Sequence, residues 1–230
     1  MHNLLLLHGA LGSRSQFDSF VPLLGDTFNV HTLNFSGHGG NVMPAAGYSF
    51  DTFAGDILKY IDGHGIARIN IFGYSMGGYA ALYFAKKHPE RVERIMTLNT
   101  KFNWDPLATA KETAMLNAEK MLEKVPAFAN NLMLQHGMNI WKQVLQNTET
   151  MMNNLASHVT LTDDDLQAIN CPVVIGVSDR DTTATIDENL DVYKKLPKAH
   201  FMVFPNTPHP FEKVNHEALA LQCNLFFNTK

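Results

Sequence analysis

The sequence IFGYSMGGY, residues 71–79, joins a short apolar run to a helical pattern and places Ser75 between Gly73 and Gly77. A chain that turns sharply from strand to helix strains its central residue, and flanking glycines remove Cβ atoms that would collide there. Such a turn holds the serine hydroxyl at the end of the strand, beside the free N–H groups of the helix N-terminus. These features predict a nucleophilic serine; the alternative is a tight structural turn with an idle serine.

Six short runs rich in Val, Ile, Leu or Phe alternate with longer helical patterns along the chain. The runs predict strands at 4–7, 30–35, 68–72, 94–98, 173–177 and 200–204. The helical patterns cover 50–63, 76–88, 187–196 and 211–227. Continuously apolar strands are typical of a parallel sheet that is buried on both faces. The sequence therefore predicts an α/β fold with a doubly wound, mostly parallel sheet of about six strands.

Residues 101–170 interrupt this alternation, because they contain no strand pattern. Helical patterns cover KETAMLNAEKMLEKV at 111–125 and NLMLQHGMNIWKQVLQN at 131–147. We interpret 101–170 as a helical insertion, called the cap segment below, on a core formed by 1–100 and 171–230. The alternative is that these helices simply extend the core. Six of the 11 methionines lie in the cap segment, and flexible methionine side chains suit a lid that accepts varied acyl chains.

Composition excludes several classes of partner. The net charge is −4, and Lys and Arg form no basic stripe, so we expect no nucleic-acid partner. The opening MHNLLLLHG lacks a basic region and is too short to span a membrane. Two cysteines without CxxC spacing indicate neither a disulfide framework nor a zinc site. We expect a cytoplasmic protein with no membrane span, metal or organic cofactor; the sequence does not indicate its oligomeric state.

A nucleophilic serine needs a base and a group that orients the base. Ligand-binding loops of parallel sheets leave the carboxyl ends of the strands. Among the 11 histidines, His209 best meets this condition, because it follows the last predicted strand in FPNTPHPF. The loop after the preceding strand, VVIGVSDRDTT, offers Asp179 and Asp181. Asp181 lies further beyond the strand, so we predict that it is the acid and that Asp179 caps or braces the loop.

The negative oxygen that forms when a serine attacks a carbonyl needs two N–H donors. One predicted donor is Met76, at the N-terminus of the helix that follows Ser75. The other is Ala10 in LLLLHGALGS, where Gly9 and Gly12 let the backbone approach the site closely. The alternative for that loop is an ordinary glycine-rich turn.

Taken together, these motifs resemble the α/β-hydrolase superfamily over nearly the whole chain apart from the cap segment. The similar segments are His8-Gly9-Ala10, Ser36-Gly37-His38-Gly39, and the stretches at 73–77, 178–181 and 208–211. The resemblance implies a triad of Ser75, Asp181 and His209, and structural roles for His8 and His38. It also implies that the chain begins at the family's usual third strand, without the edge hairpin. Two departures alter loop stiffness: Asn34-Phe35-Ser36 replaces a usual acidic residue, and Pro208 replaces a usual glycine.

Serine at position 75 argues against dehalogenases and epoxide hydrolases of this fold, which use aspartate there. HGALGS with GYSMGG is similar to small carboxylesterases, which implies a serine hydrolase for esters of small, mainly apolar acyl groups, in a pocket with few charges. The motifs also resemble a cofactor-free C–C lyase, the menaquinone-pathway 2-succinyl-6-hydroxy-2,4-cyclohexadiene-1-carboxylate synthase. Its polycarboxylate substrate calls for arginines, and the cap segment contains none. A hydrolase-like small-molecule receptor with slow turnover is a third hypothesis.

Overall fold

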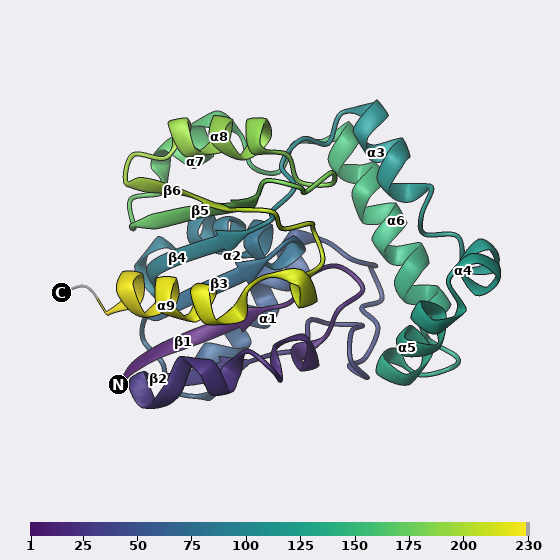
Figure 1. The fold of residues 1–230 in the computed structure, drawn as a ribbon, viewed down its shortest axis with the longest axis horizontal. Helices are drawn as coiled ribbons and strands as arrows, with labels where there is room; N and C mark the ends of the chain where they lie inside the picture. The colour runs from purple at the N-terminus through teal and green to yellow at the C-terminus, as the bar shows by residue number, and fades with distance from the viewer. Residues whose placement is uncertain (229–230) are drawn as a thin grey trace.

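The computed structural model describes residues 1–228, whose central feature is one six-stranded sheet in the order β2-β1-β3-β4-β5-β6 (Figure 1). All five pairs of neighbouring strands are parallel. The strands are β1 (His2–Leu7), β2 (Phe28–Thr32), β3 (Ile69–Tyr74), β4 (Val92–Leu98), β5 (Val173–Ser178) and β6 (Ala199–Phe204). This arrangement confirms the predicted α/β fold, and each strand overlaps one of the six predicted runs.

Helices occupy most of the connections between strands in the part of the chain that the structure describes. The α-helices are α1 (Phe50–Gly63), α2 (Met76–Lys87), α3 (Pro106–Thr113), α4 (Ala118–Lys124), α5 (Pro126–His136), α6 (Trp141–Ser157), α7 (Asp163–Ala168), α8 (Ile186–Lys195) and α9 (His216–Phe227). Short 3₁₀ helices are η1 (Arg14–Phe17), η2 (Val21–Thr27), η3 (Pro89–Arg91) and η4 (Phe211–Lys213).

Alternating side chains of the buried strands supply two separate cores. On β1, Leu5 and Leu7 pack with residues of α1, α2 and α8, whereas Leu4 and Leu6 pack with α9, η1 and η2. All four leucines are fully buried, because successive side chains of a strand point to opposite faces of the sheet. The sheet is therefore covered on both faces, and α9 lies in front of it in Figure 1.

The parallel strands end along a common edge. The registers pair Leu7 with Gly73, Tyr74 with Leu98, and Ser178 with Phe204. In Figure 1 the strand arrows point toward this edge, and helices α3 to α6 lie beyond it. The loops that follow β1, β3, β5 and β6 therefore open toward these helices, which is where the candidate site residues lie.

Two predicted core elements are shorter or divided in the structure. β2 ends at Thr32 rather than at 35, because its last pair with β1 is Leu6–Thr32 and the Phe35 N–H donates to a histidine side chain instead. The predicted helix at 211–227 is divided into η4 and α9. Asn215 begins α9, since its side chain accepts from the Ala218 N–H at 3.0 Å, and this capping bond sets a new helix start.

Both helical patterns predicted in the cap segment are also divided. Asn117 begins α4 by accepting from the Lys120 N–H at 2.8 Å, so 111–125 forms parts of α3 and α4. Gly137 has φ +98°, which ends α5 and separates it from α6. The division into a core at 1–100 and 171–230 and a cap at 101–170 stays a prediction. The last two residues of that predicted core, 229–230, lie outside the described residues.

Candidate active site

Ser75 lies in the sharp turn between β3 and α2. It has φ 52° and ψ −118°, a left-handed conformation that strains a residue with a side chain. Its N–H donates to the Leu98 carbonyl at 2.8 Å and its carbonyl accepts from Gly78 N–H at 3.0 Å. A Cβ on Gly77 would lie 2.1 Å from the Leu7 carbonyl oxygen, and one on Gly73 would lie 2.4 Å from the Gly77 carbonyl oxygen. The turn thus requires glycine at both flanking positions.

His209 and Asp181 are joined by a short hydrogen bond. His209 Nδ1 lies 2.6 Å from Asp181 Oδ2, and the Asp181 side chain is fully buried. The other oxygen, Oδ1, accepts from the N–H groups of Thr183 and Ala184, each at 2.8 Å. A carboxylate held in this way accepts a hydrogen bond from Nδ1–H, which keeps the proton on Nδ1 and leaves Nε2 as a proton acceptor. No hydrogen bond within residues 1–228 joins Nε2 to the Ser75 hydroxyl.

Asp179 bonds the backbone of the turn that leads to His209, whereas the imidazole of His209 bonds Asp181. Asp179 Oδ1 accepts from the Thr207 N–H at 3.1 Å. Hydrogen bonds from backbone N–H groups, chiefly that of Asn206, lower the pKa of this carboxyl below its usual range. Asp179 is exposed, and its contacts link the loop after β5 to the loop after β6.

Two side chains that the sequence analysis missed hold the backbone of His209. Tyr74 Oη donates to the His209 carbonyl at 2.8 Å, and Asn99 Nδ2 donates to the same oxygen at 3.2 Å. Burial raises the pKa of Tyr74, so its hydroxyl stays protonated and available as a donor. Tyr74 directly precedes Ser75, and this adjacency to the turn is the only sequence signal for its role.

Two lysines of the cap segment fix the loop that carries Asp181. Lys101 Nζ donates to the Thr183 carbonyl at 3.0 Å, and Lys111 Nζ donates to the Thr182 carbonyl at 2.7 Å. Lys101 is 9% exposed. Nothing in the sequence pattern pointed to either lysine, because their partners are backbone carbonyls that lie far along the chain.

The predicted donors are Ala10, on the loop after β1, and Met76, which directly follows Ser75. Met76 is the first residue of α2, so its N–H has no partner within the helix. The Gly12 N–H donates to the Gly9 carbonyl at 3.1 Å, which closes a turn around Ala10. Neither the Ala10 nor the Met76 N–H donates to another residue in the described chain, so both are available to a ligand.

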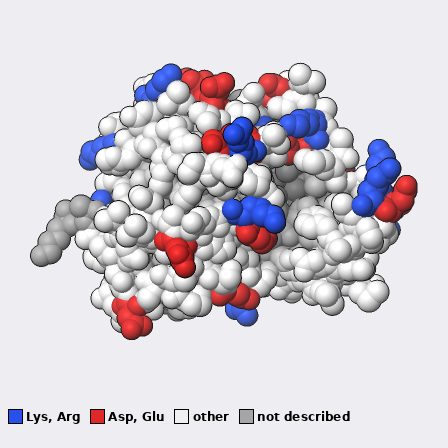
Figure 2. Space-filling view, in the orientation of Figure 1, with Lys and Arg blue, Asp and Glu red and all other residues white. Residues whose placement is uncertain are grey.

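A cavity of about 680 Å³ lies between the Ala10 loop and α5. Ala10, Leu11, Phe128 and Leu132 contribute to its lining. Arg14, Asp18 and Glu212 also line it, so it carries more charge than the sequence analysis expected of a substrate pocket. Figure 2 shows the surface hollowed between the core and the cap helices, with charges of both signs on this face.

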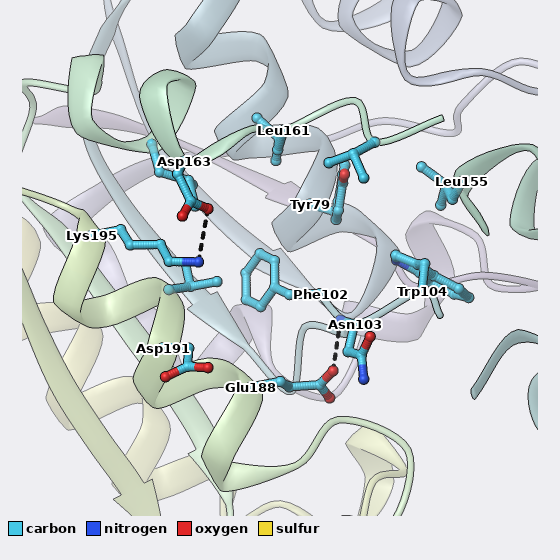
Figure 3. Close-up of a pocket in the computed structure, with 13 residues that line it drawn as sticks. Tyr79, Phe102, Asn103, Trp104, Leu155, Leu161, Asp163, Glu188, Asp191 and Lys195 are labelled. Carbon is cyan, nitrogen blue, oxygen red and sulfur yellow. Dashed lines mark hydrogen bonds and ion pairs between the residues drawn. The ribbon is translucent and has the colours of Figure 1, made fainter. Parts of the chain in front are cut away.

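A second cavity, of about 270 Å³, lies next to α8. Phe102 and Tyr79 form part of its wall, and Lys195 pairs with Asp163 at 2.7 Å on its rim (Figure 3). Tyr79 lies one helical turn after Ser75 on α2. Neither lining includes Ser75 or His209; of the two cavities, the larger reaches a candidate site residue, Ala10.

Three buried histidines lie beneath the Ala10 loop. His8 Nδ1 bonds the Gly9 carbonyl at 2.8 Å and its Nε2 accepts from the Phe35 N–H at 3.2 Å. The His38 ring lies 5.1 Å from that of His8 and 5.8 Å from that of His136. Burial lowers the pKa of His8 to about 4 and the pKa of His38 well below its usual value, and it also lowers that of His136.

These histidines predict a loss of stability in mild acid. Each binds a proton near pH 6.5 in the unfolded chain but stays neutral at lower pH in the folded chain, so falling pH favours unfolding. His8 alone should lower the free energy of unfolding by about 2 kcal/mol between pH 7 and pH 5. Burial raises the pKa of Glu112 and Glu188, which opposes this effect. Urea denaturation at pH 7 and at pH 5 measures the net change in the free energy of unfolding. The same free energy of unfolding at both pH values would contradict the prediction.

No helix within 1–228 is long and apolar enough to cross a membrane. Within the same residues, no group of three or more His, Cys, Asp or Glu side chains is arranged to hold a metal ion. Cys171 and Cys223 are both free thiols.

Comparison with known proteins identifies the family. Residues 3–137 match the model of the alpha/beta hydrolase fold. A human serine hydrolase-like protein is 29% identical over 158 residues, which cover 66% of this chain and 75% of that protein. Human serine hydrolase-like protein 2 is 34% identical over 98 residues, 42% of this chain and only 31% of that protein.

A solved structure of a thermophilic esterase from Thermogutta terrifontis has a similar fold, with a TM-score of 0.78 and 20% identity. The superposition covers 99% of this chain and 89% of the esterase. With more than half of its length matched by the family model, the chain belongs to the alpha/beta hydrolase family.

Proposed function

We propose that this protein is a serine hydrolase that cleaves carboxylic esters through an acyl-enzyme intermediate. The observation that carries the proposal is the 2.6 Å contact between Asp181 and His209, at the sheet edge where the strained turn presents Ser75. A buried carboxylate that orients a histidine near a half-buried serine is the arrangement that activates a hydroxyl for attack on a carbonyl.

The proposed reaction begins with His209 Nε2 taking the proton of Ser75 as the hydroxyl oxygen attacks the ester carbonyl. The Ala10 and Met76 N–H groups stabilise the resulting oxyanion. His209 then gives the proton to the departing alcohol. Water repeats the two steps on the acyl-enzyme, which releases the acid and restores Ser75. Asp181 keeps the proton of the resting imidazole on Nδ1 throughout.

We further propose that the favoured substrates are esters of short to medium, mainly apolar acids. One arginine faces two carboxylates around the cavity beside Ala10: Arg14 against Asp18 and Glu212. The cap segment contains no arginine. A polyanionic substrate would therefore meet net negative charge at this cavity, whereas Leu11, Phe128 and Leu132 offer apolar contact.

A reducing compartment such as the cytoplasm fits the proposal. The thiols of Cys171 and Cys223 are free, and Cys223 is fully buried beside Met96. Burial raises the pKa of Cys171 to about 11, so its thiol stays protonated and unreactive near neutral pH. Neither cysteine therefore indicates a role in disulfide chemistry.

Two substrates separate the proposed activity from its alternatives. We expect p-nitrophenyl butyrate to be cleaved with a burst of nitrophenol equal to the amount of enzyme whenever release of the acyl group is the slow step. The matched comparison is the polycarboxylate substrate of the menaquinone-pathway lyase at equal concentration. Efficient pyruvate elimination with negligible ester cleavage would replace the esterase by a lyase. Binding of both without turnover would instead indicate a receptor.

A further inference from the structure

His136, the last residue of α5, links the helices beyond the sheet edge to two loops of the core. Its Nε2 lies 3.0 Å from the Leu11 carbonyl, and its Nδ1 lies 3.0 Å from the Gly39 N–H. The residue is 3% exposed. Both ring nitrogens of a buried histidine are therefore occupied by backbone groups, one from the loop after β1 and one from the loop after β2.

These partners assign the form of the ring. The Gly39 N–H can only donate, so Nδ1 carries no proton and Nε2 donates its proton to the Leu11 carbonyl. Burial lowers the pKa of His136, and the neighbouring His8 and His38 are themselves buried. The ring is thus neutral, with one donor and one acceptor in fixed directions.

The loop that His136 holds is strained next to the proposed oxyanion donor. Leu11 has φ +58°, a left-handed conformation that disfavours a leucine. It directly follows Ala10, inside the turn closed by Gly12 and Gly9. From the other side, Gln16 Oε1 accepts the Gly9 N–H at 3.0 Å. External bonds are needed here, because a free loop would relax at Leu11 and turn the Ala10 N–H away.

We propose that His136 is a positioning residue: by holding the Leu11 carbonyl, it keeps the Ala10 N–H aimed at the reacting carbonyl oxygen. The proposal rests on the hydrolase function proposed above and adds a requirement to it. The helices beyond the sheet edge then do more than cover the substrate, because the oxyanion site is complete only while the end of α5 is docked.

Two substitutions separate the two bonds of His136. In His136→Gln the side-chain amide replaces Nε2 and can still donate to the Leu11 carbonyl. In His136→Asn the amide oxygen replaces Nδ1 and can still accept from Gly39. The Leu11 carbonyl then loses its 3.0 Å contact with the ring and keeps only the long contact from Gln135 Nε2 at 3.5 Å. Each variant removes one of the two buried bonds of His136, so both should lose similar stability. Only the Asn variant should lose the geometry of the oxyanion site.

We expect His136→Asn to lower kcat by about 10- to 100-fold with KM within about twofold, since the lost contact acts on the transition state. His136→Gln should stay within about threefold of the unaltered protein in both. The rate at which a fluorophosphonate labels Ser75 should fall in parallel in the Asn variant, because its reaction also builds charge on the oxygen facing Ala10. His158→Asn is the matched control, since His158 is exposed at the end of α6.

Melting temperatures complete the comparison. Equal losses of activity in the Asn and Gln variants, losses that follow melting temperature alone, or unchanged activity in both would overturn the positioning role. So would an effect confined to KM. Failure of the proposed function would look different, because Ser75 would then take no fluorophosphonate label even in the unaltered protein. That result would remove both proposals together.

Discussion

Ser75→Ala should lower kcat for p-nitrophenyl butyrate by about 10³-fold or more, because the candidate nucleophile, base and acid act as a unit. The variant should fold as the unaltered protein does. Alanine removes only the hydroxyl, and the backbone bonds of Ser75 to Leu98 and Gly78 do not use it. The backbone at position 75 remains left-handed, so the substitution neither adds nor relieves that strain.

Labelling with a fluorophosphonate, followed by peptide mapping, checks the same prediction without a substrate. We expect one label, on Ser75, among the eight serines of the chain. Ser157→Ala supplies the control, because Ser157 is exposed at the end of α6 and its hydroxyl donates to the Asn153 carbonyl. Label that persists in the Ser75→Ala protein would place the nucleophile elsewhere.

Asp181→Asn should lower kcat by about 10³- to 10⁴-fold. The N–H groups of Thr183 and Ala184 both point at Oδ1, so asparagine must place its carbonyl oxygen there. Its NH₂ group then faces His209 Nδ1, which has to act as acceptor. The imidazole proton moves to Nε2, and the ring can no longer take the proton of Ser75.

Asp179→Asn is the matched control for that loss. It removes the same charge two residues away, while the side-chain oxygen can still accept from the Thr207 N–H. We expect kcat to change by less than about tenfold, since the turn survives and the imidazole of His209 keeps its partner. Steady-state kinetics of the two variants decides between the aspartates, and a larger loss in Asp179→Asn would reverse their proposed roles.

Much of the fold could be predicted because strands buried on both faces leave a plain signal. The run at 4–7 is four consecutive leucines, and it forms the fully buried end of β1. The breaks within helical patterns were harder to predict. Asn117 and Asn215 begin new helices through single capping bonds, and each lies inside an otherwise continuous pattern. Gly137 lies inside the helical pattern at 131–147, but a glycine within such a pattern does not by itself predict that the helix ends there.

The sheet edge also accounts for what could be predicted of the site. Ser75, Asp181 and His209 each follow a strand, and parallel strands bring such positions together whatever their distance along the chain. The roles of His136, Lys101 and Tyr74 could not be predicted, because their partners are backbone groups of distant loops. No spacing rule connects residue 136 with residue 11, so only the folded chain reveals the contact.

The connection between β4 and β5 has a consequence for how such a protein can diversify. Residues 99–172 leave the sheet after Leu98 and return before Val173, while direct pairing from Ile95–Val173 to Leu98–Gly176 fixes the two strands. Lengthening a flexible connection twofold costs only about 0.6 kcal/mol in closure entropy. Helices of this connection can therefore be exchanged without moving Ser75 or His209, provided that Asn99, Lys101 and Lys111 keep their bonds to the loops that carry His209 and Asp181. A transplanted segment must still end a helix beside Leu11 with a donor for its carbonyl.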